Sequence, residues 1–66
     1  MKSNKLKAKI IERGMNVEEL ASAIGMDKTT MYRKLRDIEK FTVGDVAKIK
    51  EKLELTSDET CAIFID

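Results

Sequence analysis

Apolar residues recur along the chain at spacings of three and four, which is the period of an amphipathic helix. The pattern runs in separate segments, and most of them follow a residue that can cap a helix N-terminus. Glu stands three residues after Asn16 and after Thr56, and Asp45 stands three residues after Thr42. This is the spacing of a capping box. Asp27 begins a further segment in the same frame, so the pattern predicts an all-α chain.

Glycines indicate where two of these helices end. Gly14 follows the lysine-rich first segment and Gly25 follows the second, and a glycine just past a helix readily adopts the left-handed conformation. We expect five helices. The first begins near Ser3, the next three cover about residues 17–24, 28–36 and 43–53, and a short fifth helix begins near Ser57. No linker or repeat divides them, so residues 1–66 are expected to form a single compact five-helix bundle.

The spacing of apolar residues also predicts the core. The inner faces of the first four helices are expected to carry Leu6, Ile10, Leu20, Ala21, Ile24, Met31, Leu35, Val46, Ile49 and Leu53. The bottom of the core is expected to be closed by Phe41, Leu55, Ile63 and Phe64. Cys61 is expected to be a small buried residue. The alternative is that Cys61 and Ile65 are exposed and form a dimer contact.

Length and composition narrow the possible functions. A domain of 66 residues has a marginal core, which a disulfide, a metal ion or a second copy usually reinforces. One cysteine and no histidine leave no internal disulfide, no zinc site and no Ser/His or Cys/His pair. The three glycines stand apart, and no apolar run approaches the length of a membrane span. We therefore expect no catalytic activity, cofactor, metal, membrane or small-molecule substrate.

The net charge of +1 conceals a separation of charge along the chain. Residues 1–40 carry ten Lys or Arg against six Asp or Glu, a net charge of +4. Residues 41–66 carry three against six, a net charge of −3. The N-terminal part of the chain is therefore suited to a polyanionic partner.

Residues 16–36 have the form of a helix-turn-helix, in which a three-residue turn containing Gly25 joins two short helices. Met31 and Leu35 are expected to point into the core. At 100° per residue, the opposite face of the same helix then carries Thr29, Arg33 and Arg36, with Lys28 in the first turn. Exposed Lys, Thr and Arg at a helix N-terminus have the chemistry to contact the major groove of DNA.

The segment Asn-Val-Glu-Glu-Leu-Ala-Ser-Ala-Ile-Gly-Met-Asp-Lys-Thr-Thr-Met-Tyr-Arg-Lys-Leu resembles the helix-turn-helix of the Cro/repressor-type, xenobiotic-response-element-like family. The resemblance covers about residues 5–65. It is closest to small phage and mobile-element regulators of Gram-positive bacteria, in the run Tyr-Arg-Lys-Leu and the Ile-Phe ending. It implies a lambda-repressor-like fold and a homodimer on a two-fold DNA operator. It also implies a place in the bacterial cytoplasm, at the nucleoid through DNA binding.

The resemblance implies base contacts by Lys28, Thr29 and Arg33, with Tyr32 as a further candidate. Arg33 could bind the O6 and N7 atoms of guanine, and Thr29 could bond a base edge or pack on the thymine methyl group. The alternative for Lys28, Thr29 and Arg33 is an ordinary solvated side chain, and for Tyr32 a ring that only covers a neighbouring helix.

Phosphate contacts are expected from helix N-termini and from the end of the third helix. The candidates are Asn16, Val17, Thr30, Arg36, Lys40 and Thr42. Two residues depart from the family pattern. Val17 stands where many relatives have a glutamine that holds phosphate, so only its amide remains. Lys34 stands where an apolar residue is common, which leaves the rotation of the third helix open.

The sequence therefore predicts a Cro-like transcriptional repressor that places its third helix in the major groove of an operator. The alternative is a protein-interaction module on the same fold, such as a phage modulator, an anti-repressor or an antitoxin. The near-zero net charge and Val17 keep that alternative open.

Overall fold

The computed structural model describes residues 2–65, and it describes their side chains from residue 5 onward. The helices are α1 (Lys2–Glu12), α2 (Val17–Ala23), α3 (Lys28–Arg36), the 3₁₀ turn η1 (Ile38–Lys40), α4 (Val43–Leu53) and α5 (Ser57–Phe64). No strand occurs among these residues, so the expected all-α fold with five helices is confirmed. The starts of α2 to α5 lie where the capping residues predict them.

Reciprocal hydrogen bonds between side chain and backbone set these helix starts. The Asn16 side chain accepts from the Glu19 amide at 2.8 Å, and the Glu19 carboxylate accepts from the Asn16 amide at 3.0 Å. Thr42 and Asp45 form the same pair of bonds at the start of α4, and α5 begins with a third capping box. Each box gives a hydrogen-bond acceptor to two backbone amides that the start of a helix would otherwise leave unpaired.

Residues with positive φ end three of the helices. Gly14 has φ +76° and Gly25 has φ +74°, as the sequence predicts for helix-terminating glycines. α4 ends instead on Glu54, a non-glycine residue at φ 53°. The Arg13 guanidinium supports this end, because its Nε donates to the Leu53 carbonyl at 2.7 Å. The exposed carbonyls at the end of α4 are thus bound by a residue from the loop after α1.

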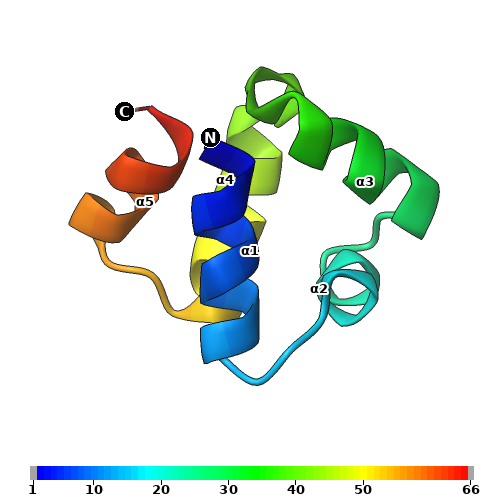
Figure 1. Cartoon of the computed structure of the whole chain (residues 1–66), viewed down its shortest axis with the longest axis horizontal. Coiled ribbons are helices and arrows are strands. Elements are labelled where there is room, and N and C mark those ends of the chain that lie inside the picture. Colours follow the sequence, from blue (N-terminus) through cyan, green and yellow to red (C-terminus); the bar gives the residue numbers. More distant parts are fainter. Residues whose placement is uncertain (1, 66) are drawn as a thin grey trace.

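The helices surround one core (Figure 1). α1 crosses the middle of the molecule, α5 lies on one side, and α2 and α3 lie on the other. α1 packs against α2 and α5, and α4 packs against the same two helices. The buried residues are Leu6, Ile10, Leu20, Ala21, Ile24, Met31, Leu35, Ile38, Phe41, Ile49, Leu53, Leu55 and Ile63.

Most of the expected core is confirmed, and four positions differ. Val46 and Phe64 are only partly buried, although both pack against the core. Ile38 is buried and was not predicted, because it lies in the 3₁₀ turn and not on a helix with an apolar period. The prediction that Cys61 is buried is wrong, since its thiol lies on an exposed face of α5. Ile63 fills the core from that helix instead.

Polar contacts hold α5 against α1. Lys9 of α1 forms an ion pair with Glu59 of α5, and Lys5 Nζ donates to the Ala62 carbonyl at 3.3 Å. The hydrogen bond from Lys9 lowers the pKa of Glu59 to about 2, and the Thr56 amide in the capping box adds to this shift. The pKa of Lys9 is raised, first by the same bond to Glu59. The pair therefore links α1 and α5 most strongly when both groups are charged.

We expect Glu59→Gln to reduce the acid sensitivity of the fold. The pKa of Glu59 is about 2 in the folded chain against an ordinary value of 4.5, so its stabilising effect is complete above 4.5 and is lost as the pH falls towards 2. Gln can still accept from the Thr56 amide, so the capping box remains while the charge is removed. Between pH 6 and pH 3, the melting temperature measured by circular dichroism should fall further for the wild type than for E59Q.

Glu51→Gln is the matched control, because it removes an exposed carboxylate of α4 with the same change in net charge. E51Q should keep the acid sensitivity of the wild type. Equal acid sensitivity in E59Q and the wild type would show that the ion pair adds nothing to stability.

Candidate nucleic-acid interface

The angle between α2 and α3 is set by a tight turn around Gly25. The Met26 amide donates to the Ala21 carbonyl at 2.8 Å, and Gly25 between them has φ +74°. This is the hydrogen bond of a Schellman-type helix end. Leu20, Ala21 and Met31 are all at most 1% exposed where the two helices pack together. The turn and the packing thus fix how α3 projects from the rest of the molecule.

The buried face of α3 determines which side chains point outward. Met31 is fully buried and Leu35 is 2% exposed. Lys28, Thr29, Tyr32, Arg33 and Arg36 are all exposed. The structure therefore brings together on one helix the residues expected to contact bases, as well as Arg36 from the expected phosphate contacts.

Lys34 shows how the departure from the family pattern is accommodated. Its ammonium group forms an ion pair with Asp45 at 2.7 Å, and the two side chains are 21% and 16% exposed. Lys34 thus packs towards α4, while Leu35 takes the apolar position in the core. The hydrogen bond from Lys34 lowers the pKa of Asp45, and partial burial opposes the shift. The rotation of α3 that the sequence left open is the one with Met31 and Leu35 inward.

The cap of α3 uses the hydroxyl of Thr30. The Asp27 carboxylate accepts from the amides of Thr29 and Thr30, and Thr30 Oγ1 donates to it at 2.6 Å. These bonds lower the pKa of Asp27, with the Thr30 hydroxyl as the largest cause. Thr30 is half-buried, and in this arrangement its hydroxyl proton is directed to Asp27. Its hydroxyl therefore has no second proton to donate to a phosphate.

The N-termini of α2 and α4 differ as anion sites. The capping boxes already use the amides of Asn16 and Thr42, which donate to Glu19 and Asp45. The amides of the next two residues of each helix remain, because no preceding turn offers them a carbonyl. α2 carries two carboxylates in its first turn, whereas α4 carries one, and that one is paired with Lys34. The start of α4 is therefore the less repulsive site for an anion.

The glycine in the first turn of α4 also favours close approach. A Cβ atom at Gly44 would meet only the Thr42 hydroxyl, at 3.8 Å, so the backbone there is open. Val17 at the start of α2 is half-buried and packs against the core. Lys40 lies at the end of η1 and is exposed, while Ile38 anchors the same turn in the core. Sequence reasoning missed this turn, which gives the loop around Lys40 a fixed course.

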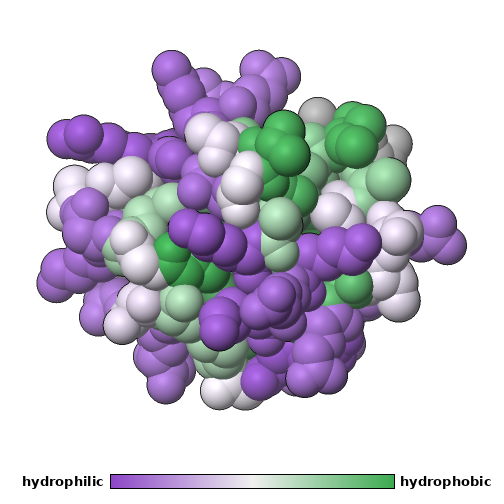
Figure 2. Space-filling model, turned by 180° about the vertical axis from the view of Figure 1, so that it is seen from behind, coloured by the Kyte–Doolittle hydropathy of each residue, from purple (hydrophilic) through white to green (hydrophobic). Residues whose placement is uncertain are grey.

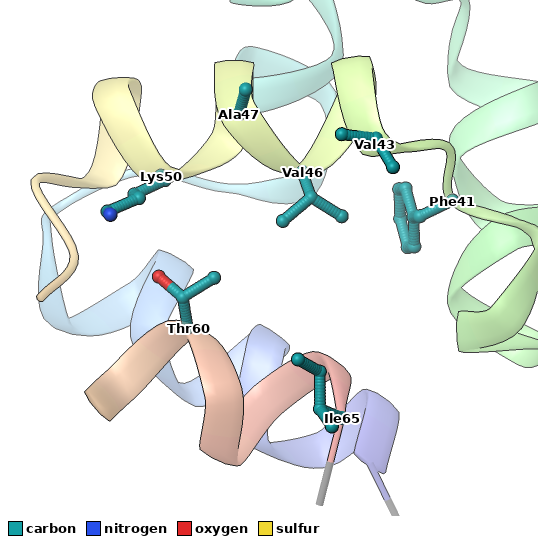
Figure 3. A pocket seen from close by; sticks show the side chains of 7 residues that line it. All are labelled: Phe41, Val43, Val46, Ala47, Lys50, Thr60 and Ile65. Carbon is teal, nitrogen blue, oxygen red and sulfur yellow. The ribbon is translucent and has the colours of Figure 1, made fainter. Parts of the chain in front are cut away.

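An apolar groove lies between α4 and α5. It has a volume of about 410 Å³ and is lined by Phe41, Val43, Val46, Ala47, Lys50, Thr60 and Ile65. Val46 points from α4 towards α5, and Thr60 and Ile65 point back across the gap (Figure 3). Val43 is 88% exposed and Ile65 is 74% exposed. The space-filling view from behind (Figure 2) shows hydrophobic residues gathered at its upper right, with hydrophilic residues to their left and below them.

Within residues 2–65, no group of His, Cys, Asp or Glu side chains is placed to hold a metal ion. None of the helices described there is long and apolar enough to cross a membrane.

Comparison with known families agrees with this geometry. The model of the Cro/C1-type HTH DNA-binding domain matches residues 5–59, which covers α2 and α3 together with α4 and the start of α5. Comparisons with curated proteins and with solved structures gave no match. A capped and exposed α3, held by a tight turn against α2, is the arrangement expected of such a domain. The chain belongs to the family of Cro/C1-type helix-turn-helix DNA-binding domains.

Proposed function

We propose that this DNA-binding domain is a Cro-like repressor, which inserts α3 into the major groove of an operator and blocks transcription by occupying it. The observation that carries the proposal is the exposed face of α3. Lys28, Thr29 and Arg33 point outward there, while Met31 and Leu35 are buried behind them. A rigid helix that presents donors on one face is suited to reading base edges.

The base contacts follow from the chemistry of each side chain. Arg33 offers two parallel N–H donors to the O6 and N7 atoms of guanine. Thr29 offers a hydroxyl to a base edge or its methyl group to thymine, and Lys28 reaches forward from the first turn. Tyr32 is 42% exposed, so part of its ring is available to a base or to the sugar-phosphate backbone.

The phosphate contacts come from residues on both sides of α3. Arg36 and Lys40 are exposed and follow the base-contacting residues along the chain. The free amides at the start of α4, after the Thr42 cap, are the stronger of the two helix N-terminal sites. The Val17 amide after Asn16 is the weaker one, because Glu18 and Glu19 stand beside it. Thr30 contributes through the cap of α3, where its hydroxyl donates to Asp27 and not to a phosphate.

We further propose that a second copy of the chain occupies the α4–α5 groove, so that the domain binds DNA as a homodimer. Exposed Glu51, Glu54 and Asp58 lie in the same part of the chain as Lys50, which lines the groove. In the proposed dimer, carboxylates of the second copy would pair with Lys50.

The size and place of the groove fit a dimer that forms on DNA. Its seven lining residues are fewer than the roughly 20–30 per side of a standard stable interface, so pairing in solution should be weak. α3 and α5 lie on opposite sides of the molecule (Figure 1), whose longest extent is 27 Å. Two copies joined near α5 therefore separate their α3 helices by more than one molecular width. This agrees with half-sites about 34 Å apart.

Selection from a library of random duplex DNA, at two salt concentrations, tests operator binding. We expect recovery of a two-fold symmetric site whose affinity falls steeply as salt rises, because each neutralised phosphate releases counterions. Recovery of no sequence, with weak binding at low salt only, would contradict the operator-binding role. The groove would then be examined as the binding site of a different protein.

Two substitutions separate base contacts from phosphate contacts. Arg33→Ala should cost about 1–3 kcal/mol on the selected site and relax one base position, since a bidentate contact to guanine is lost. Lys40→Ala should weaken binding to all duplexes by a similar factor and reduce the salt dependence. Fluorescence anisotropy on the selected site and on a scrambled duplex measures both. Equal losses on both duplexes for R33A would exclude a base contact by Arg33.

Ile65→Lys tests the groove as the dimer surface. A lysine on this rim should keep the fold, because Ile65 is 74% exposed, but two ammonium groups would then face each other across the pair. Cooperative filling of the two half-sites should be lost, while binding to a single half-site remains. Ile11→Lys is the matched control, because Ile11 is 73% exposed on α1 and does not line the groove. If I11K and I65K retain cooperativity equally, the dimer surface lies elsewhere.

A further inference from the structure

One carboxylate connects the DNA-reading helix to the helix that follows it. Asp45 Oδ2 accepts from Lys34 Nζ of α3 at 2.7 Å and from the Thr42 amide at 3.1 Å. The Asp45 amide in turn donates to the Thr42 hydroxyl oxygen, at 3.1 Å. The capping box of α4 and the ion pair to α3 therefore share a single side chain.

The Lys34–Asp45 ion pair lies where it can fix the rotation of α3 about its own axis. Lys34 follows Arg33 directly, so at 100° per residue it lies beside the outward face and on the side of α4. Met31 and Leu35 hold the opposite part of α3 through apolar packing, which is not directional. The charged hydrogen bond adds a direction and a length to that packing. It ties α3 to the first turn of α4, where the proposal above places a phosphate.

The pair also changes the charge that DNA encounters. Both side chains are less than a quarter exposed, so neither moves freely in solvent. Lys34 without Asp45 would be one more mobile cation beside the phosphate backbone. Such a cation raises affinity for every duplex and carries no sequence information.

We infer that Asp45 is a positioning residue for sequence discrimination. By binding Lys34 it fixes α3 against the start of α4, and it withholds one cation from non-specific phosphate contact. This inference rests on the proposed operator binding. Asp45 itself touches no base, but through Lys34 it increases the ratio of specific to non-specific affinity for DNA.

Asp45→Asn tests this inference with little change to the fold. Asn can still accept from the Thr42 amide, so the cap of α4 is kept while the charge on Lys34 is left unpaired. D45N should bind a scrambled duplex more tightly than the wild type and show a steeper salt dependence, by about one phosphate contact. Its ratio of specific to scrambled affinity should fall several-fold. A purely structural role would instead lower both affinities together.

Two further variants make the result decisive. Lys34→Met keeps an apolar stem and leaves the cap of α4 intact, so it should lower the ratio without raising the affinity for scrambled DNA. Glu12→Gln changes the net charge as D45N does, but at an exposed position of α1 that belongs neither to the proposed DNA contacts nor to the groove, and it should leave the ratio unchanged. If the wild type selects an operator and D45N and K34M both keep its ratio, the inference is wrong and operator binding stands. If the wild type selects no operator, both are wrong.

Discussion

The burial of one face of α3 is the constraint on which the DNA-binding surface depends. Met31 and Leu35 can enter the core only if α3 has one rotation about its axis, and that rotation presents Thr29 and Arg33 to solvent. The approach of α2 then sets the angle, because Leu20 and Ala21 leave no room for another. The side chains proposed to read DNA are thus positioned by residues that are buried in the core.

Because the core is small, polar contacts at the helix ends do much to fix the positions of the helices. Each α-helix after α1 begins with a side-chain cap, and three of those caps are reciprocal boxes. Two boxes also extend to another element, because Glu59 pairs with Lys9 of α1 and Asp45 pairs with Lys34 of α3. The same carboxylate therefore defines a helix start and fixes its neighbour. This arrangement reinforces a 66-residue domain whose one cysteine, Cys61, is free.

Local patterns in the sequence were sufficient for the helices and most of the core, because caps and apolar periods act within a few residues. They could not predict Arg13 bound to Leu53, or Lys34 bound to Asp45, since these partners are 40 and 11 residues apart. Ile38 was missed because a single 3₁₀ turn has no period to detect. Cys61 was placed wrongly because the run from Cys61 to Ile65 is apolar throughout, and only packing decides that Ile63 turns inward. The outward residues of α3 were predictable, but their contacts with DNA remain a prediction.

The distribution of charge suggests how such a domain could discriminate among DNA sequences. A net charge of +1 gives little long-range attraction to DNA, so non-specific binding should be weak. Carboxylates also stand close to the cations of the proposed interface, with Asp27 at the start of α3 and Asp45 on Lys34. In the proposed dimer, affinity would come from directed contacts and from the pairing of two copies, since joining two weak modules multiplies their binding. Weak non-specific attraction, combined with specific contacts by two copies, would favour a proposed operator over the far more numerous competing sites.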